Sequence, residues 1–121
     1  MHNIENTFKN FARLPARVAI YVPGTSGPAA ADPALAERMT AETAGALSDL
    51  FGGATISLAA GAWMSAELGL IREDVQIVYS FAELDALDAH AADVLQIAQR
   101  VKTEMQQEAV SVEINGALYL I

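Results

Sequence analysis

The chain has no cysteine and only two histidines among its 121 residues. Without a thiol it cannot form a disulfide, and it offers neither a cysteine nucleophile nor the thiolates of a zinc finger or an iron–sulfur cluster. His2 and His90 form no His-x-x-x-His or Glu-x-x-His pair. The sequence therefore predicts no dedicated metal site and no cofactor.

Long apolar runs and basic residues are also scarce. No apolar run reaches the roughly 18 residues that a membrane span needs, and the first residues lack the basic-then-apolar order of a signal peptide. Seven basic residues stand against fifteen acidic ones, for a net charge of −8. Because neither a span nor a signal peptide is predicted, we expect a cytoplasmic protein with no membrane partner. Because an acidic body repels phosphate groups, we also expect no direct nucleic-acid partner.

The charge is unevenly distributed. Up to Ala31 the chain carries three basic residues and one acidic residue, and from Asp32 onward it carries four basic and fourteen acidic residues. Such a body suits a protein partner with a basic surface, including one that normally grips DNA or RNA. The alternative is that the acidic residues only keep an alanine-rich protein soluble.

The length predicts a single domain, residues 17–121, preceded by an N-terminal arm, residues 1–16. Apolar residues of the arm line one face of a short helix that Pro15 ends. They are Ile4, Phe8, Phe11 and Leu14. We expect this arm to pack on the protein's own core, the alternatives being that it docks on a partner or is a loosely packed terminus.

Alternating apolar and polar residues predict five strands. They span residues 17–23, 54–63, 73–79, 109–114 and 117–121. Asn115-Gly116 between the last two strands is a strong signal for a two-residue hairpin.

Two helices are predicted between these strands. Asp32-Pro33 is a good start for the first helix, and Gly52-Gly53 favours its end. The second helix begins at the capping-box pattern Ser80 to Glu83. It carries a seven-position apolar seam on one face, made of Leu84, Leu87, Ala91, Val94, Ala98, Val101 and Met105.

The predicted order is strand, helix, strand, strand, helix, strand, strand. The first six elements are typical of an α+β, ferredoxin-like βαββαβ fold, here with an extra C-terminal hairpin strand. Both helices are expected to cover one face of an antiparallel sheet. The mixed polarity predicted for the other face favours a homodimer, the alternative being that the arm covers that face.

Residues expected on this open face include Ala19, Tyr21, Thr55, Ser57, Gln76, Val78, Ser111 and Glu113. Trp63 either plugs the end of the core or projects as an interface anchor. The residues predicted for an interface are Trp63, Tyr21, Val78, Glu73 and Asp74.

The loop Gly24, Thr25, Ser26 and Gly27 lies between a strand and a helix, where binding loops often occur. Its backbone amides, together with Tyr21, are a candidate ligand or phosphate site. No Walker lysine follows, so an ordinary connection is the alternative.

No catalytic residue is assigned from the sequence. His90 and Asp93 have helical spacing, and a proton relay between them is conceivable. The interpretation that we prefer is that His90 is an ordinary half-exposed helix residue.

One half of the chain carries a recurring pattern. It consists of Phe51-Gly52-Gly53-Ala54-Thr55, Gly61-Ala62-Trp63 and the segment from Glu67 to Glu73. This pattern resembles that of small uncharacterised proteins of bacteria, plasmids and phages with a ferredoxin-like α+β fold. The resemblance implies the fold and transfers no catalytic residue.

The leading functional hypothesis is a non-catalytic, acidic interaction protein that binds a macromolecular partner. If it is cargo of a mobile element, its target would be a host nucleic-acid-handling or defence complex, as for anti-CRISPR proteins. The alternative is a dimer that binds and sequesters a small molecule or nucleotide. A third hypothesis is a cofactor-free enzyme of the dimeric ferredoxin-like kind that uses Tyr21 or His90.

Overall fold

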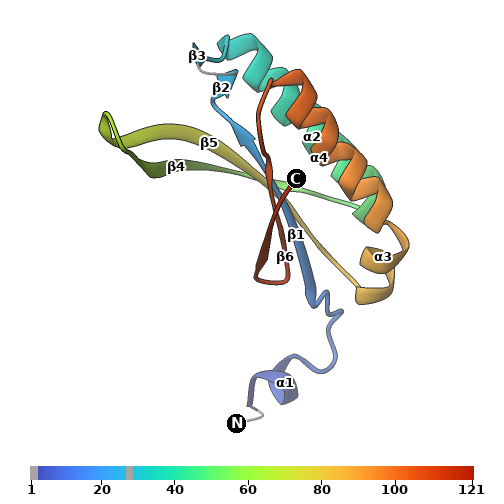
Figure 1. Ribbon diagram of the computed structural model, residues 1–121. Coiled ribbons are helices and arrows are strands. Elements are labelled where there is room, and N and C mark those ends of the chain that lie inside the picture. Colours follow the sequence, from blue (N-terminus) through green and yellow to red (C-terminus); the bar gives the residue numbers. More distant parts are fainter. Residues whose placement is uncertain (1–2, 27–28) are drawn as a thin grey trace.

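The computed structural model describes residues 3–26 and 29–121, and its main feature is a five-stranded antiparallel sheet (Figure 1). The strands lie in the order β4-β5-β1-β6-β7. Their bounds are β1 Ala16–Pro23, β4 Thr55–Ser65, β5 Gly69–Ala82, β6 Ser111–Ile114 and β7 Ala117–Leu120. The first four of these strands have the order of a ferredoxin-like sheet, and β7 extends the edge through the predicted Asn115-Gly116 hairpin.

The helices lie together on one face of this sheet, as Figure 1 shows. They are α2 Pro33–Phe51, α3 Leu84–Ala89 and α4 Ala91–Glu104. A further short helix, α1 Asn3–Phe8, precedes the sheet. The predicted α+β, ferredoxin-like fold is thus confirmed.

The predicted ends of α2 are present in the structure. An Asp32 side-chain oxygen accepts a hydrogen bond from the Ala34 N–H at 3.0 Å, so the carboxylate caps the first turn. At the other end Gly52 adopts φ = 92°, and its N–H donates to the Ser48 carbonyl. A glycine is favoured at this position because the left-handed conformation costs it little.

The prediction of one unbroken second helix is wrong. The chain leaves the helical conformation at His90, which separates α3 from α4. The capping box is also absent, because Ser80 still belongs to β5, where its hydroxyl donates to the Gly53 carbonyl at 2.7 Å. Glu83 is the residue before α3, and its side chain makes no capping hydrogen bond.

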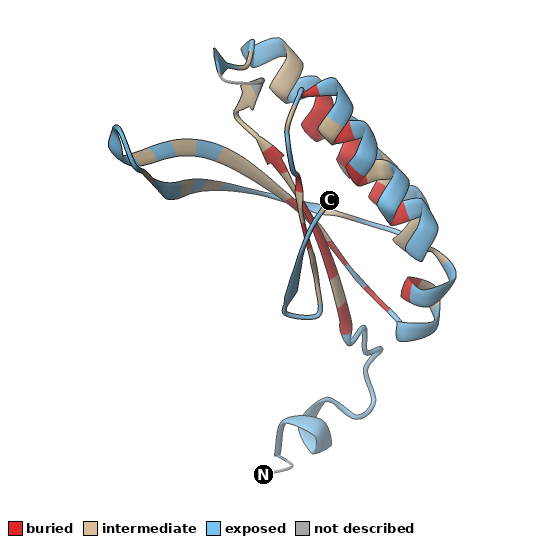
Figure 2. Ribbon diagram, viewed as in Figure 1, coloured by how far each residue is buried: buried red, intermediate tan, exposed pale blue. Residues whose placement is uncertain are grey.

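The core lies between the helices and the central strand β1 (Figure 2). The seam residues Leu87, Val94, Ala98, Val101 and Met105 are buried as predicted. The other two are not, because Ala91 is exposed and Leu84 is 54% exposed. The buried seam residues pack with Val18, Ile20 and Val22 of β1 and with Met39 and Leu47 of α2.

The expectation that Gln76 and Val78 lie on the open face is wrong. Val78 pairs with Ile20 and lies fully buried beneath the helices, and Gln76 points to the same side. The opposite residues, Val75, Ile77 and Tyr79, therefore face away from the helices. Both sets contain apolar residues, so alternation alone did not fix the face, and the register with β1 decides it.

β4 and β5 form a hairpin that projects beyond the helical layer (Figure 1). Large apolar side chains near its end are exposed, including Trp63, Met64, Leu68 and Leu70. With 53% of its surface exposed, Trp63 does not plug the core.

The arm does not pack on the protein's own core, contrary to expectation. Every residue from 3 to 15 is exposed, including Ile4, Phe8, Phe11 and Leu14. Figure 1 shows α1 held away from the sheet and the helices.

No helix in the described ranges is both long and apolar enough to cross a membrane.

Candidate functional site

The open face of the sheet carries a polar cluster made by Arg17, Tyr21 and Glu113. Glu113 of β6 pairs in register with Ala19 of β1, so its side chain lies between those of Arg17 and Tyr21, two residues to either side. The Tyr21 hydroxyl donates to Glu113 Oε1 at 3.1 Å. Arg17 Nε lies 3.5 Å from Glu113 Oε2, so the carboxylate has a partner on each side.

Aromatic rings extend this cluster toward β5. The Arg17 guanidinium lies 4.0 Å from the centroid of the Tyr79 ring, a cation–π distance. The Tyr79 ring in turn meets Phe81 edge to face, with the centroids 6.0 Å apart. Arg17 is therefore held between a carboxylate and an aromatic face.

Next to Tyr21 is a hollow of about 360 Å³ between the middle part of the β4–β5 hairpin, at residues 59–63 and 73–77, and residues 107–111. Val75 and Ile77 contribute its apolar surface, while Tyr21, Trp63 and Glu73 contribute aromatic and acidic groups. The volume lies within the range of small-molecule pockets. In the described residues Glu73 forms no ion pair, so its negative charge is not compensated locally.

The hydroxyl of Tyr21 is held in its protonated form. Burial is the largest cause that raises its pKa, and the hydrogen bond to Glu113 and the negative charge of Glu113 raise it further. The positive charge of Arg17 acts in the opposite direction. Tyr21 is thus a neutral hydroxyl at the edge of the hollow, with its one proton donated to Glu113.

Residues predicted for an interface come together in this hollow. Tyr21 was predicted for both ligand binding and an interface, and Trp63 and Glu73 for an interface only. Asp74 also lines the hollow. Val78, predicted for the same interface, lies in the core and cannot contribute.

The predicted ligand loop is not part of this hollow. Gly24 borders another hollow, beside the start of α2 on the other side of the sheet. Thr25 and Ser26 form β2 Thr25–Ser26, which pairs with β3 Ala29–Ala30, and Gly27 lies outside the described residues. The loop and Tyr21 therefore do not form the single site that was expected.

Gly24 has a structural role that explains its identity. Its N–H donates to the Asp74 carbonyl at 2.9 Å, and an added Cβ would lie only 2.6 Å from that oxygen. The close approach of two backbones requires glycine here.

His90 and Tyr21 are not brought together either. His90 lies between α3 and α4 in the helical layer, where its Nδ1 lies 3.0 Å from Asp93 Oδ2 and its ring meets Phe51 edge to face. The proposed His90–Asp93 contact thus exists, but it does not line the hollow at Tyr21. Residues 3–26 and 29–121 contain no group of three metal-ligating side chains.

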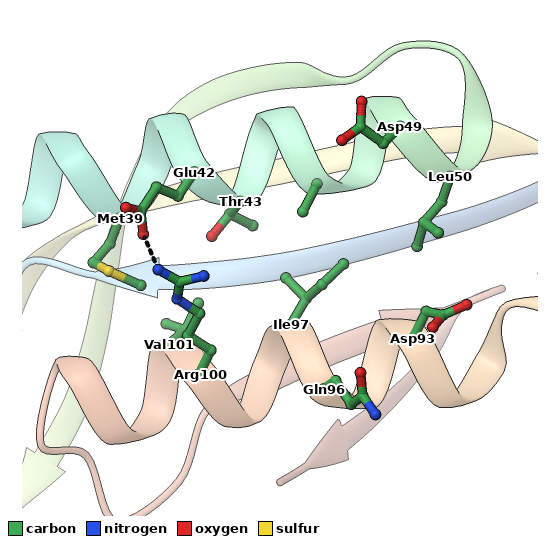
Figure 3. A pocket seen from close by; sticks show the side chains of 11 residues that line it. Met39, Glu42, Thr43, Asp49, Leu50, Asp93, Gln96, Ile97, Arg100 and Val101 are labelled. Carbon is green, nitrogen blue, oxygen red and sulfur yellow. Dashed lines mark ion pairs between the residues drawn. The ribbon is translucent and has the colours of Figure 1, made fainter.

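A second groove lies between α2 and α4, and Figure 3 shows it from close by. Met39, Thr43, Ile97 and Val101 form its floor. Arg100 crosses it to reach Glu42, with 3.2 Å between Nη2 and Oε2.

No site role was predicted for Arg17 or Glu113. Alternation in residues 109–114 did place Glu113 on the same face as Tyr21. The missing information was the pairing of β6 with β1, which no local pattern specifies.

No protein-family model and no curated protein sequence matches the chain. Among solved structures, it is similar to a phage SAM lyase in complex with S-methyl-5′-thioadenosine, with a TM-score of 0.64, 20% identity, and 92% of each chain covered. A phage SAM lyase in the apo state is also similar, with a TM-score of 0.61, 15% identity, and 92% of this chain and 94% of the other covered. At these identities the likeness shows a shared fold.

This finding contradicts the leading functional hypothesis of a non-catalytic, anti-CRISPR-like interaction protein. The solved structures that share the fold over almost the whole chain are those of an enzyme, one of them with a small molecule bound. It favours the alternative from the sequence, a protein that binds a small molecule or nucleotide.

Proposed function

We propose that the chain is a small-molecule enzyme that binds S-adenosylmethionine at the open face of its sheet and cleaves it to S-methyl-5′-thioadenosine. The observation that carries the proposal is the likeness, over 92% of the chain, to a SAM lyase that holds this thioadenosine. The hollow at Tyr21 is the supporting feature of this chain itself.

The chemistry of the hollow suits a sulfonium nucleoside. S-adenosylmethionine carries a positive sulfur, which the uncompensated carboxylate of Glu73 attracts. The rings of Tyr21 and Trp63 offer flat faces for a cation or an adenine base. The apolar side chains of Val75 and Ile77 exclude water from the ligand's methyl and methylene groups.

The cleavage breaks one carbon–sulfur bond of the substrate. Formation of the thioadenosine requires the bond between sulfur and the γ-carbon of the amino acid fragment to break. The electron pair of that bond stays on sulfur, which becomes a neutral thioether. The substrate's own carboxylate oxygen attacks the γ-carbon as the bond breaks, so the amino acid fragment leaves as homoserine lactone. The protein's part is to position the substrate. The Tyr21 hydroxyl donates its one proton to Glu113 and therefore presents its oxygen to the substrate as a neutral acceptor.

A turnover assay tests this proposal. The purified protein is incubated with S-adenosylmethionine, and the products are separated by liquid chromatography with mass detection. We expect S-methyl-5′-thioadenosine to accumulate, and Glu73→Gln to lower kcat/KM by about tenfold, the effect of losing a partly solvated charge interaction of about 1 to 2 kcal/mol. Asp88→Asn, which removes an exposed carboxylate from α3, should leave the rate unchanged.

Binding measurements separate the charge effect from a loss of structure. Glu73→Gln should weaken binding of the cationic substrate much more than binding of the neutral thioadenosine. If the protein neither forms the thioadenosine nor binds either compound in calorimetry, the proposal is wrong.

A further inference from the structure

The N-terminal arm, here residues 3–15, is an unusual feature of this chain because its large apolar side chains have no cover. Phe11 is 68% exposed and Ile4 is 72% exposed, and Phe8 and Leu14 are exposed as well. The rings of Phe8 and Phe11 lie 6.0 Å apart and form one aromatic pair. In water such a segment gains free energy by packing against an apolar surface.

The arm is also basic, unlike the rest of the chain. Lys9 and Arg13 lie beside the two phenylalanines, and the only acidic residue of the arm is Glu5. Within the described residues, no ion pair involves Lys9 or Arg13. A surface that fits the arm therefore combines apolar contacts with negative charge.

The groove between α2 and α4 has this combination (Figure 3). Its floor contains the apolar side chains of Met39, Ile97 and Val101. Asp49 and Asp93 lie at one end of it, on α2 and α4 respectively, and neither has a lysine or arginine partner in the described residues. Figure 3 shows Ile97 pointing into the space between the helices, with Asp93 further along α4 and Asp49 on the outer edge of α2.

The groove has a volume of about 360 Å³, which suits bulky side chains inserted from a second chain. The Arg100–Glu42 pair crosses the groove at a distance from Asp49 and Asp93 along the helices, so Arg100 does not neutralise either aspartate. Asp93 contacts the His90 ring, with 3.0 Å between Oδ2 and Nδ1. The arm and the groove are thus complementary in two ways. The rings of Phe8 and Phe11 suit the apolar floor, and the cations of Lys9 and Arg13 suit the two aspartates.

The position of the arm favours docking in the groove of a second copy over docking in the groove of its own chain. Figure 1 shows that the arm leads away from the body at the start of β1, whereas the groove lies in the helical layer. We infer that the arm of one copy docks in the α2–α4 groove of another, with Phe8 and Phe11 in the groove and Lys9 and Arg13 near Asp49 and Asp93. This self-association is independent of the function proposed above.

Cysteine cross-linking tests the inference directly, because the chain has no cysteine of its own. Ala12→Cys lies in the arm and Ala46→Cys lies at the groove. When the two single variants are mixed and oxidised, a disulfide-linked heterodimer is expected. Ala12→Cys mixed with Ser57→Cys, on the exposed open face, is the matched control and should give little product.

The other outcomes overturn the inference. A doubly substituted chain, Ala12→Cys with Ala46→Cys, that cross-links only within itself at high dilution and at high concentration would show that the arm folds back on its own body. Preferential cross-linking of Ala12→Cys to Ser57→Cys would place the arm on the open face. The absence of any cross-link to Ala46→Cys would leave the groove without its proposed occupant.

Charge exchange provides a second, independent measurement. Lys9→Glu with Arg13→Glu should lower the association constant in sedimentation by about tenfold, and so should Asp49→Lys with Asp93→Lys. Mixing the two double variants should restore association, since the charges are again complementary. All these residues are exposed, so the variants should fold, which circular dichroism verifies. Failure of the mixture to recover would contradict the proposed contact.

Discussion

At the scale of single residues, Glu113 organises the open face. It holds Tyr21 by a hydrogen bond and Arg17 by an ion pair, and Arg17 in turn lies over Tyr79. Four side chains from three strands are thereby fixed in a region that the sequence described only as mixed in polarity. The cluster positions Tyr21 at the hollow, which gives that residue its proposed role.

The pKa of Tyr21 depends on its contacts within this cluster. Its pKa lies above the ordinary value, chiefly through burial and then through Glu113. We expect Glu113→Gln to shift the midpoint of the Tyr21 titration to lower pH, because the nearby negative charge is removed. Phenolate absorbance measured for this variant and for the unsubstituted chain, each minus its Tyr21→Phe counterpart, checks the shift.

The sign of the effect on stability follows from the same pKa. The folded chain binds the Tyr21 proton more tightly than the unfolded chain does. Its contribution to the free energy of unfolding is therefore fully present below the unfolded pKa and is lost as the pH rises through the folded pKa. In Tyr21→Phe, this part of the alkaline loss of stability should disappear. An unchanged alkaline profile would contradict the assignment.

At the scale of elements, two glycines have opposite roles. Gly24 lies where β1 approaches β5 too closely for a side chain, whereas Gly45 lies in α2 with no atom near a built Cβ. Gly24→Ala should lower the free energy of unfolding by about 1–3 kcal/mol through overpacking. Gly45→Ala should raise it by about 0.5–1 kcal/mol, since alanine favours the helix.

Urea unfolding of both variants measures the difference. The pair also distinguishes a structural role of Gly24 from a ligand-binding role, because no ligand is present in the experiment. A neutral effect of Gly24→Ala would show that β1 and β5 separate easily at this point and would contradict the structural role.

The sequence predicted elements well where a local signal exists. Asp32 and Gly52 cap the ends of α2 through hydrogen bonds to residues within one or two helical turns. Asn115 and Gly116 both adopt the positive φ values that their hairpin needs. Prediction failed where the signal depended on distant contacts. Ser80 looked like a helix cap, yet its hydroxyl bonds to the Gly53 carbonyl, 27 residues away.

At the scale of the whole molecule, the sheet divides into a buried part and a projecting part. β1 is paired on both sides, with β5 and β6, and lies beneath the helices. The end of the β4–β5 hairpin extends beyond them and exposes Trp63, Met64 and Leu68. Local stability should therefore differ strongly along the same sheet.

Hydrogen exchange checks this difference. We expect amides of β1, such as those of Ile20 and Val22, to exchange about a thousandfold more slowly than strand amides near Ser65 and Gly69, because local opening costs less than global unfolding. Measurement in dilute solution keeps any self-association low. Equal protection in both regions would show that the hairpin end is not free in the single chain.

The sequence by itself determined the fold class, the order of elements and most of their ends, because periodicity, caps and turns are local properties of the chain. It also placed Tyr21, Trp63 and Glu73 among the functional candidates. Only the tertiary structure decided which of them meet, since the register between β1, β5 and β6 depends on contacts between distant segments. That register buries Val78, joins Tyr21 to Glu113 and leaves the predicted loop at Gly24 outside the hollow.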